Sequence, residues 1–450
     1  MSNPHLYRTL WRWHFYAGVF CIPFIIFLSV SGAIYLFKPQ IESWQDRAEN
    51  NLTQSGQTAS ANQHIQAALS ALPGALFTSY QLPQSANHAI VITLKKDATK
   101  YAVYVHPSNL SILKVVNKDS SFINLVRTFH GELLAGNVGS ILVELAACWA
   151  IVLVLTGLYL WWPRNLKGFG GIVYPRINLG VRTTLRDLHA VTGFWIAFFT
   201  LFLLLSGLPW ALVWGGGFKE VRQWANQPKA AAHAHGEHAA HASNQPESTQ
   251  PDWTLSRQQE KPVWMAQAVA NANLPQAVLA AAHAQQLAPP IELSLANSET
   301  NNWKAASQNQ NRPLRTTVWL DGATGAITKQ STFSEKNTLD KAIGIGIAAH
   351  EGQLFGWFNQ LLGLITALGL VTLSITGFLM WRKRKPNESL KQALGAPPPP
   401  SKRAMGTGVA VITLATAAFL PLLAISIIAL IILEQGVLRF LPRTRVWLGI

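Results

Sequence analysis

The sequence predicts an integral membrane α-helical bundle of about five transmembrane helices in tandem-duplicated two-helix units, with two small α+β modules outside the membrane. Three observations predict this fold. Only 13% of the 450 residues are charged. Five apolar runs are each long enough to cross a hydrocarbon core of about 30 Å at about 1.5 Å per residue. Finally, two kinds of histidine motif each occur twice, once in each half of the chain.

The predicted segments follow one another as two similar units with a fifth helix appended. The first apolar run is too long for a signal peptide and no small-x-small cleavage site ends it, so we expect it to remain as an anchor. The segments are the N-terminus with the first membrane helix (1–37), an outer module (38–129), the second helix (130–163), a basic loop (164–188), the third helix (189–214), a His-rich linker with the second outer module (215–349), the fourth helix (350–382), a linker (383–405), the fifth helix (406–434) and a tail (435–450).

The net charge of +15 is concentrated in short loops. Residues 163–189 carry +4 and residues 382–405 carry +6, whereas the long segments 38–122 and 215–349 carry only +2 and +1. The positive-inside rule therefore places the N-terminus and both short loops in the cytoplasm and the long segments outside. The basic loops also suit anionic membrane lipid, and we find no nucleic-acid-binding module. Cys21 and Cys148 fall inside apolar runs, so we expect neither a disulfide framework nor a Cys-ligated metal site.

Each outer module is predicted to contain an Ala-rich helix, at 61–72 and 264–273, followed by strands rich in β-branched residues. A hairpin turn ends each module, at His106-Pro-Ser-Asn-Leu110 and at Asp321-Gly-Ala-Thr-Gly325. Before the second module lies a His-rich tract that could bind a transition metal loosely, although a disordered linker is the favoured interpretation. Its histidines are His233, His235, His238 and His241.

Four histidines carry the functional signal. His14 and His189 each stand in Thr-Leu-x-x-x-His-x3-Gly and are followed at the same distance by Ser-Gly, at Ser31-Gly32 and Ser206-Gly207. His130 and His350 each stand in His-x3-Leu-x-Gly and reach Thr-Gly 26 residues later, at Thr156-Gly157 and Thr376-Gly377. Because corresponding helices run in the same direction, we expect His14 and His189 to meet at the inner face and His130 and His350 at the outer face.

Two axial imidazoles are what a low-spin b-type haem needs. We therefore predict two haem b groups, one between His14 and His189 and one between His130 and His350. A metal-transport path through the same histidines is the main alternative, but transporters usually place ion ligands near the membrane midplane.

Glycines and arginines near these histidines complete the predicted cofactor sites. Gly18 and Gly193, one turn after the inner histidines, and Gly32 and Gly207, about 27 Å deeper on the same helix face, would give a macrocycle room. Gly157 and Gly377 fall off the face of the histidines that precede them, so only close helix packing is assigned to them. Arg12 and Arg186, with Arg8 and Arg182, could pair with haem propionates or serve as ordinary basic flanks. Glu144, an acid deep in the second helix, is either functional or hydrogen-bonded to a neighbouring helix.

The chain resembles the PepSY-associated transmembrane family, in which PepSY modules sit outside the membrane between helices that carry single histidines. The resemblance covers roughly residues 5–385 and depends on Trp13-His14-x3-Gly18, Leu188-His189-x3-Gly193, the expected helix starts at His130 and His350, two Thr-Gly-x-x-x-Trp endings and the Asp321–Gly325 turn. It implies a bacterial inner-membrane oxidoreductase, similar to haem-containing ferric-siderophore reductases, that releases iron by reducing Fe(III) to Fe(II) at the periplasmic face. Two departures stand out: the chain has no fused flavin domain, so a separate cytoplasmic or quinol electron donor is implied, and the first module has His106-Pro-Ser-Asn-Leu110 where an Asp-x-x-Thr-Gly turn is expected.

Three other functions remain open on the sequence. A haem cytochrome b could serve another periplasmic acceptor. A non-enzymatic protein could use its PepSY modules to bind peptides or regulate a peptidase. A metal permease would move the ion without changing its redox state.

Overall fold

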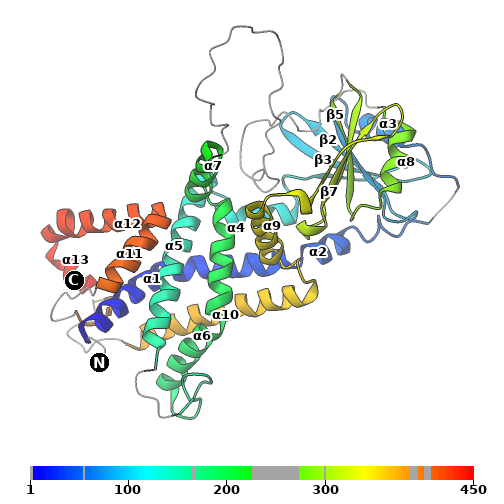
Figure 1. Cartoon of the computed structure of the whole chain (residues 1–450). Helices are drawn as coiled ribbons and strands as arrows, with labels where there is room; N and C mark the ends of the chain where they lie inside the picture. Colours follow the sequence, from blue (N-terminus) through cyan, green and yellow to red (C-terminus); the bar gives the residue numbers. More distant parts are fainter. Residues whose placement is uncertain are drawn as a thin grey trace, which may run out of the picture. The chain divides into compact units, whose positions relative to one another are not determined.

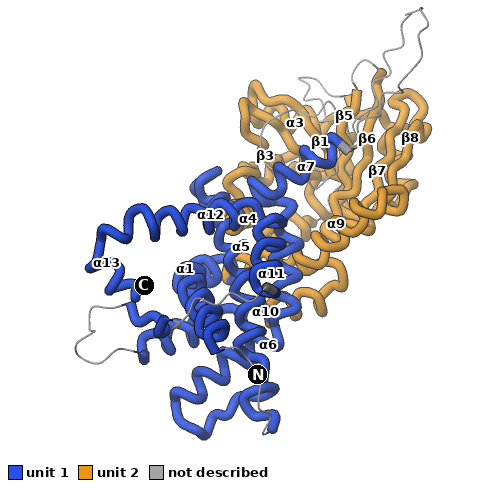
Figure 2. The backbone as a smooth tube through the Cα atoms, turned by 60° about the vertical axis from the view of Figure 1, so that its left-hand side comes forward, with its two compact units in different colours: residues 1–29, 131–258, 366–450 blue, residues 30–130, 259–365 orange. Residues whose placement is uncertain are grey.

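The computed structural model describes residues 4–53, 56–163, 168–225, 273–297, 300–384, 394–399 and 407–449. The His-rich tract from His233 to His241 and most of the helix expected at 264–273 therefore lie outside the described residues. The chain divides into two compact units, shown in different colours in Figure 2. Unit 1 comprises residues 1–29, 131–258 and 366–450, and unit 2 comprises residues 30–130 and 259–365.

Five helical segments in the described part of the chain are long and apolar enough to cross a membrane, as expected. Four are single α-helices: α1 (Pro4–Leu36), α5 (Gly136–Trp161), α6 (Val181–Gly207) and α10 (Trp357–Lys383). The fifth, Pro421–Phe440, consists of α12 (Pro421–Ile432) and the short turns η6 (Leu433–Val437) and η7 (Leu438–Phe440).

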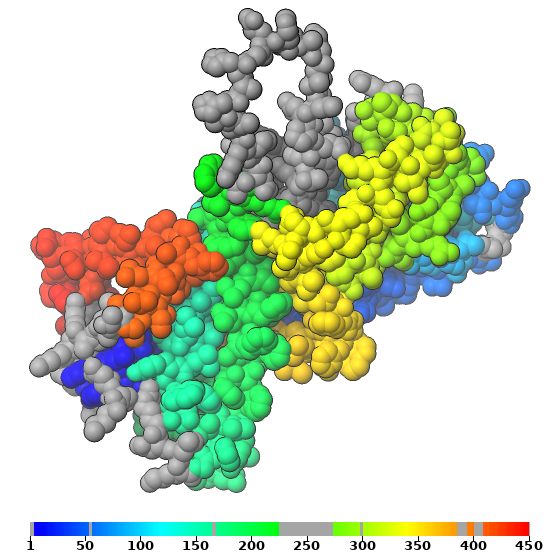
Figure 3. All heavy atoms as spheres, viewed as in Figure 1, coloured from blue at the N-terminus to red at the C-terminus, as the bar shows by residue number. Residues whose placement is uncertain are grey.

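The single fifth helix predicted at 406–434 is wrong in its detail. The chain forms a separate α11 (Thr407–Phe419) before α12, and the two are interrupted at Leu420. Pro421 has no backbone N–H and disfavours the helical conformation in the residue before it, which explains the break. Helix α11, orange in Figure 3, lies at the surface of unit 1, where Leu414 is 70% exposed, as suits a helix that contacts lipid.

Unit 1 packs α5 against α6 and buries a small apolar core where α12 joins them. Its centre is formed by Cys148, Ile151, Leu208, Leu420 and Leu423. The remaining helices of this unit are η1 (Leu208–Trp210), α7 (Val213–Ala225) and α13 (Pro442–Leu448).

Unit 2 contains one antiparallel eight-stranded sheet, to which each of the two predicted α+β modules contributes four strands. Its order is β4-β3-β2-β1-β5-β6-β7-β8, so two four-stranded meanders join edge to edge through β1 and β5, where Tyr80 pairs with Leu293. The pairing satisfies backbone groups that two isolated modules would leave exposed at their edges. The strands are β1 (Leu76–Leu82), β2 (Ile90–Lys96), β3 (Thr99–Val105), β4 (Ile112–Asn117), β5 (Ile291–Asn297), β6 (Asn302–Ser307), β7 (Thr316–Asp321) and β8 (Ile327–Thr332).

Helices α3 (Ala61–Ala71) and α8 (Gln276–Ala284) lie against this sheet (Figure 1). Ile65 and Val278 project from them into a common core with Phe77 and Trp303, and all four side chains are at most 1% exposed. A capping box between Ser60 and Gln63 begins α3. Each meander therefore carries its own helix: α3 confirms the helix predicted at 61–72, whereas α8 begins after the range 264–273 predicted for the second.

The two hairpin turns have the same geometry despite their different sequences. Asp321 Oδ1 accepts hydrogen bonds from the backbone N–H groups of Ala323 and Thr324, at 3.1 and 2.8 Å, and Gly325 takes a positive φ of 72°. In the first meander His106 Nδ1 accepts from Ser108 and Asn109 at 3.2 and 3.3 Å, and Leu110 takes φ 63°. His106 thus replaces the aspartate, so the departure from the family pattern preserves the turn.

The described part of unit 2 also contains α2 (Lys38–Gln45), α4 (Phe122–Glu132), α9 (Thr338–His350) and the short helices η3 (Arg312–Leu314) and η4 (Phe333–Glu335). His130 and His350 lie on α4 and α9, which corrects the expectation that they begin membrane helices. Positive φ values interrupt the chain before α5, at Leu133, Leu134 and Gly136, and before α10, at Gly352 and Gly356. A right-handed helix cannot continue through such residues.

Candidate metal centre

Helices α1 and α6 bring His14 and His189 together in unit 1, as the matched motifs predict. Their ring centroids are 6.2 Å apart and the ring planes are nearly perpendicular, at 87°. This distance lies within the range of edge-to-face ring contacts, and it is also close to the separation that one metal ion between two imidazoles requires. A metal–nitrogen bond of about 2 Å and about 1 Å more from each nitrogen to its ring centre give roughly 6 Å.

Thr156 of α5 determines which nitrogen of the neutral His14 ring carries the proton. Its Oγ1 lies 3.0 Å from His14 Nδ1 and 2.6 Å from the carbonyl oxygen of Val152. Because the single hydroxyl proton goes to that carbonyl, the hydroxyl oxygen must accept from Nδ1–H. The neutral ring then carries its free lone pair on Nε2, the atom that can bind a metal.

Thr376 of α10 makes the equivalent hydrogen bond to His189 and selects the same tautomer. Its Oγ1 lies 3.1 Å from His189 Nδ1 and donates to the carbonyl oxygen of Thr372 at 2.6 Å. The carbonyl oxygen of Leu373 is a second acceptor, 3.1 Å from the same Nδ1. A carbonyl cannot donate, so His189 must also carry its proton on Nδ1. Within the described part of the chain, neither His14 nor His189 makes a hydrogen bond through Nε2.

The glycine after each threonine makes room for the same histidine ring. A Cβ atom on Gly157 would lie 3.2 Å from Cε1 of His14, and one on Gly377 would lie 3.4 Å from Cε1 of His189. The assignment of these glycines to helix packing alone was therefore incomplete. They lie off the face of the histidines that precede them because they serve the histidines of α1 and α6. We call each such Thr-Gly or Ser-Gly pair, together with the ring that it contacts, a histidine cradle.

A third cradle holds His130 in unit 2. Ser31 Oγ lies 2.9 Å from His130 Nδ1, and a Cβ atom on Gly32 would lie 3.2 Å from its Cε1. Gly32 is thus at the level of His130, as predicted. The ring for which it makes room is the imidazole of His130, whereas the sequence predicts a haem macrocycle there. The pairing of His130 with His350 and the role of Gly207 stay predictions.

Gly18 and Gly193 face leucines on the helices that carry the cradles. Their nearest neighbours would be Leu153 at 3.9 Å and Leu373 at 3.6 Å, which are ordinary van der Waals distances. Both glycines therefore bring their helix close to α5 or α10. A role in making room for a macrocycle stays a prediction.

Two of the arginines predicted to bind propionates, Arg12 and Arg186, have partners within unit 1. Arg12, only 8% exposed, donates to the carbonyl oxygens of Pro397 and Gly449 and to the Tyr16 hydroxyl. Arg186 binds the carboxylate of Asp187, which is fully buried. Arg176 binds that carboxylate as well, at 2.7 Å. These contacts tie α1 to the C-terminal segment and the 168–180 loop to α6.

Glu144 has a structural partner in unit 1. Its two carboxylate oxygens accept from the backbone N–H groups of Val213 and Trp214, at 2.8 and 3.0 Å, where α7 begins. These are donors that a helix N-terminus leaves unpaired, and a carboxylate there is favoured by the helix dipole. Of the two interpretations of Glu144, the hydrogen bond to a neighbouring helix is confirmed.

The neighbourhood of His350 in unit 2 is rich in cations. Glu351 follows it in the chain, and burial raises the pKa of this carboxyl group. Four basic residues act on the pKa in the opposite direction, namely Arg312, Lys38, Arg315 and Arg127. Arg127 also stands one turn before His130 on α4. Four basic side chains therefore act electrostatically on this carboxyl group.

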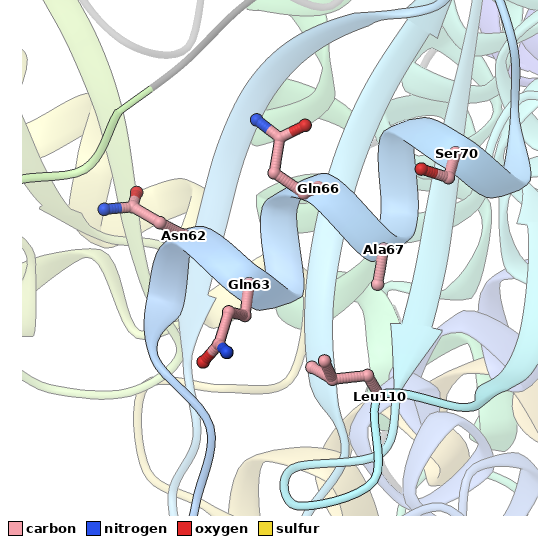
Figure 4. A pocket seen from close by; sticks show the side chains of 6 residues that line it. All are labelled: Asn62, Gln63, Gln66, Ala67, Ser70 and Leu110. Carbon is pink, nitrogen blue, oxygen red and sulfur yellow. The ribbon is translucent and has the colours of Figure 1, made fainter.

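A shallow groove on the sheet module is lined by Asn62, Gln63, Gln66, Ala67, Ser70 and Leu110 (Figure 4). Its volume is about 370 Å³, and its lining has no titratable side chain. It offers hydrogen bonds but no group for redox or acid–base chemistry, so the histidine cradles remain the chemically distinctive site.

Comparison with known proteins identifies a family for this chain. Residues 11–384 match a family model described as the PepSY-associated TM region. The match spans the three histidine cradles and the whole sheet. No curated protein matches the chain.

Proposed function

The chain belongs to the PepSY-associated transmembrane family, and from this premise we propose that it is a diheme electron-transfer protein of the bacterial inner membrane that reduces ferric siderophores at the periplasmic face. One haem b would be bound by His14 and His189, and the second by His130 and His350. The observation that carries the proposal is the His14–His189 pair, perpendicular and 6.2 Å apart, with both Nδ1 atoms held by threonine hydroxyls.

The donor set favours a haem over a bare metal ion. Among the residues that the structure describes, no group of three or more His, Cys, Asp or Glu side chains is placed to hold a metal. Two imidazoles alone leave most coordination positions of an ion empty, whereas a macrocycle fills four of them and needs two axial ligands. This argues against the metal-permease alternative.

When bound, a b-type haem supplies a one-electron iron couple that its ligands and surroundings tune. The chain itself positions the ligands. Thr156 and Thr376 hold the rings in the tautomer that exposes Nε2, and Gly157 and Gly377 admit the rings between the helices. The apolar helices exclude water from this environment.

The acceptor that we propose is an anionic ferric chelate. The four basic side chains that act on Glu351 would favour a negatively charged ligand in this region. The hard oxygen ligands of a siderophore hold Fe(III) far better than Fe(II), so that one electron releases the metal. The electron would come from a separate cytoplasmic or quinol donor.

The test is the reoxidation of reduced protein. Full-length protein in lipid nanodiscs, reduced with dithionite and freed from excess reductant, is mixed with a ferric siderophore and an Fe(II)-trapping dye. We expect haem oxidation and Fe(II) capture to occur together, and a redox-inert gallium(III) chelate to cause neither. A haem-containing protein that ferric chelates do not oxidise would favour a cytochrome with another acceptor. A haem-free protein would favour the peptide-binding alternative.

A further inference from the structure

Arg384 immediately follows α10 in unit 1 and stacks on two aromatic rings of α1. Its guanidinium carbon lies 4.9 Å from the ring centroid of Trp11 and 5.7 Å from that of Phe15. These residues are one helical turn apart and flank His14 in the sequence, so the guanidinium lies within one turn of His14 along α1. Stacking holds the planar group in a fixed position, which an ammonium group would not share.

One side of this guanidinium lacks a partner. The NH1 nitrogen of Arg384 is buried and makes no hydrogen bond to any described residue. A buried charged donor without an acceptor is strongly unfavourable, so the site calls for an anion. Burial and the nearby Arg182 both lower the pKa of Arg384, which is the opposite of what a protein carboxylate partner would do.

Among the described residues, the charged groups near Arg384 do not supply that anion. Asp187, the fully buried acid of α6, is bound by Arg176 and Arg186. Arg12, a buried arginine two residues before His14, is occupied by backbone carbonyls and Tyr16. Arg384 therefore differs from Arg12, Arg176 and Arg186 in having a stacked guanidinium with a buried donor that remains available.

We infer that Arg384 binds a propionate carboxylate of the haem held by His14 and His189. The inference rests on the proposed function and assigns to that site a residue on α10 that recognises the cofactor's anionic edge. A planar guanidinium matches a carboxylate with two parallel hydrogen bonds. Arg384 is thus a positioning residue for the first haem. Its guanidinium is placed by stacking on Trp11 and Phe15 of α1, the helix that also carries His14.

The test compares Arg384→Gln with Arg382→Gln in full-length protein in nanodiscs. Arg382 is exposed at the end of the same helix, so both variants lose one positive charge within two residues of each other. A His130→Ala background isolates the first haem, and its content, hemin affinity and midpoint potential are measured. Loss of a bound cation should disfavour the reduced haem about tenfold, a fall of about 59 mV for one electron, and Arg382→Gln should leave the potential unchanged. Arg384→Lys, which keeps the charge without the planar fork, should shift it less.

Three outcomes would overturn the inference in different ways. If Arg384→Gln retains haem at an unchanged potential, the haem assignment stands and Arg384 does not contact it. If that variant alters only the retention of anionic phospholipid, measured by native mass spectrometry, its partner is a lipid phosphate. If wild-type protein binds no haem, the proposed function itself fails. Thermal unfolding of each variant shows that a loss of haem does not follow from misfolding.

Discussion

Replacing Thr156 with valine tests how the cradle selects the metal-binding tautomer of His14. Valine keeps the shape of threonine but removes the oxygen that lies 3.0 Å from His14 Nδ1. Without a bound haem the ring can move its proton to Nε2 and avoid an unpaired donor. With Nε2 bound to iron, the proton must stay on Nδ1, where the less well placed carbonyl oxygen of Leu153 is the acceptor that remains. The Thr156→Val substitution therefore raises the free energy of the haem-bound state more than that of the haem-free state.

The expected loss follows from the cost of one unsatisfied buried donor. That cost is about 1–3 kcal/mol, which corresponds to a roughly 5- to 150-fold weaker binding of haem. Thr376→Val should cost less than about tenfold, because the carbonyl oxygen of Leu373 still lies 3.1 Å from His189 Nδ1. Thr156→Ser keeps the hydroxyl group and should bind haem almost as wild type does.

The assay is a hemin titration of apo-protein in nanodiscs, followed at the Soret band, in a His130→Ala background so that only the first site is filled. The order of affinity should be wild type, Thr156→Ser, Thr376→Val and Thr156→Val, from tightest to weakest. Equal affinities for Thr156→Val and wild type would refute the tautomer argument. A Thr156→Ser protein as weak as Thr156→Val would show that the methyl group, and not the hydroxyl, is what matters.

Three further changes test other parts of the structure. Gly157→Val should weaken haem binding more than Gly18→Ala, because its Cβ would lie 3.2 Å from His14 Cε1, whereas a Cβ on Gly18 meets nothing closer than 3.9 Å; Soret titration compares them. Glu144→Ala should lower the thermal unfolding temperature, since two N–H groups at the start of α7 lose their acceptor at about 1–3 kcal/mol each, while the Soret spectrum stays unchanged. Burial lowers the pKa of His64 in the sheet module, so the unfolded chain binds a proton first as the pH falls below about 6.5, and stability should decrease there; His64→Gln should reduce this pH dependence in thermal melts.

The meeting of His14 and His189 could be predicted from the sequence because it depends only on matched motifs and on the direction of two membrane helices. Hydrophobic length and charge asymmetry give that direction without knowledge of side-chain contacts. The same reasoning gave the level of Gly32 on α1. It could not reveal that Thr156 and Gly157 serve a histidine of another helix, because that contact depends on how α5 packs against α1.

Other differences have local causes that leave little trace in a sequence. Leu133 and Leu134 take positive φ values of 50° and 58°, which leucine rarely adopts. The sequence therefore contains no signal that α4 ends before α5 begins. The joining of the two meanders depends on edge pairing between strands far apart in the chain. Arg382 and Arg384 stand in the same short run of basic residues. The stacking of Arg384 on Trp11, which distinguishes it, depends on how α10 packs against α1.

The central claim, that two histidine pairs each bind one haem, is tested most directly by counting haems. The visible spectrum of detergent-purified protein, oxidised and dithionite-reduced, is recorded with haem quantified per chain in wild type, His14→Ala and His130→Ala. The proposed function predicts two low-spin b-type haems in wild type and one in each variant. A wild-type protein that stays colourless after reconstitution with hemin would contradict it, as would variants that keep both haems.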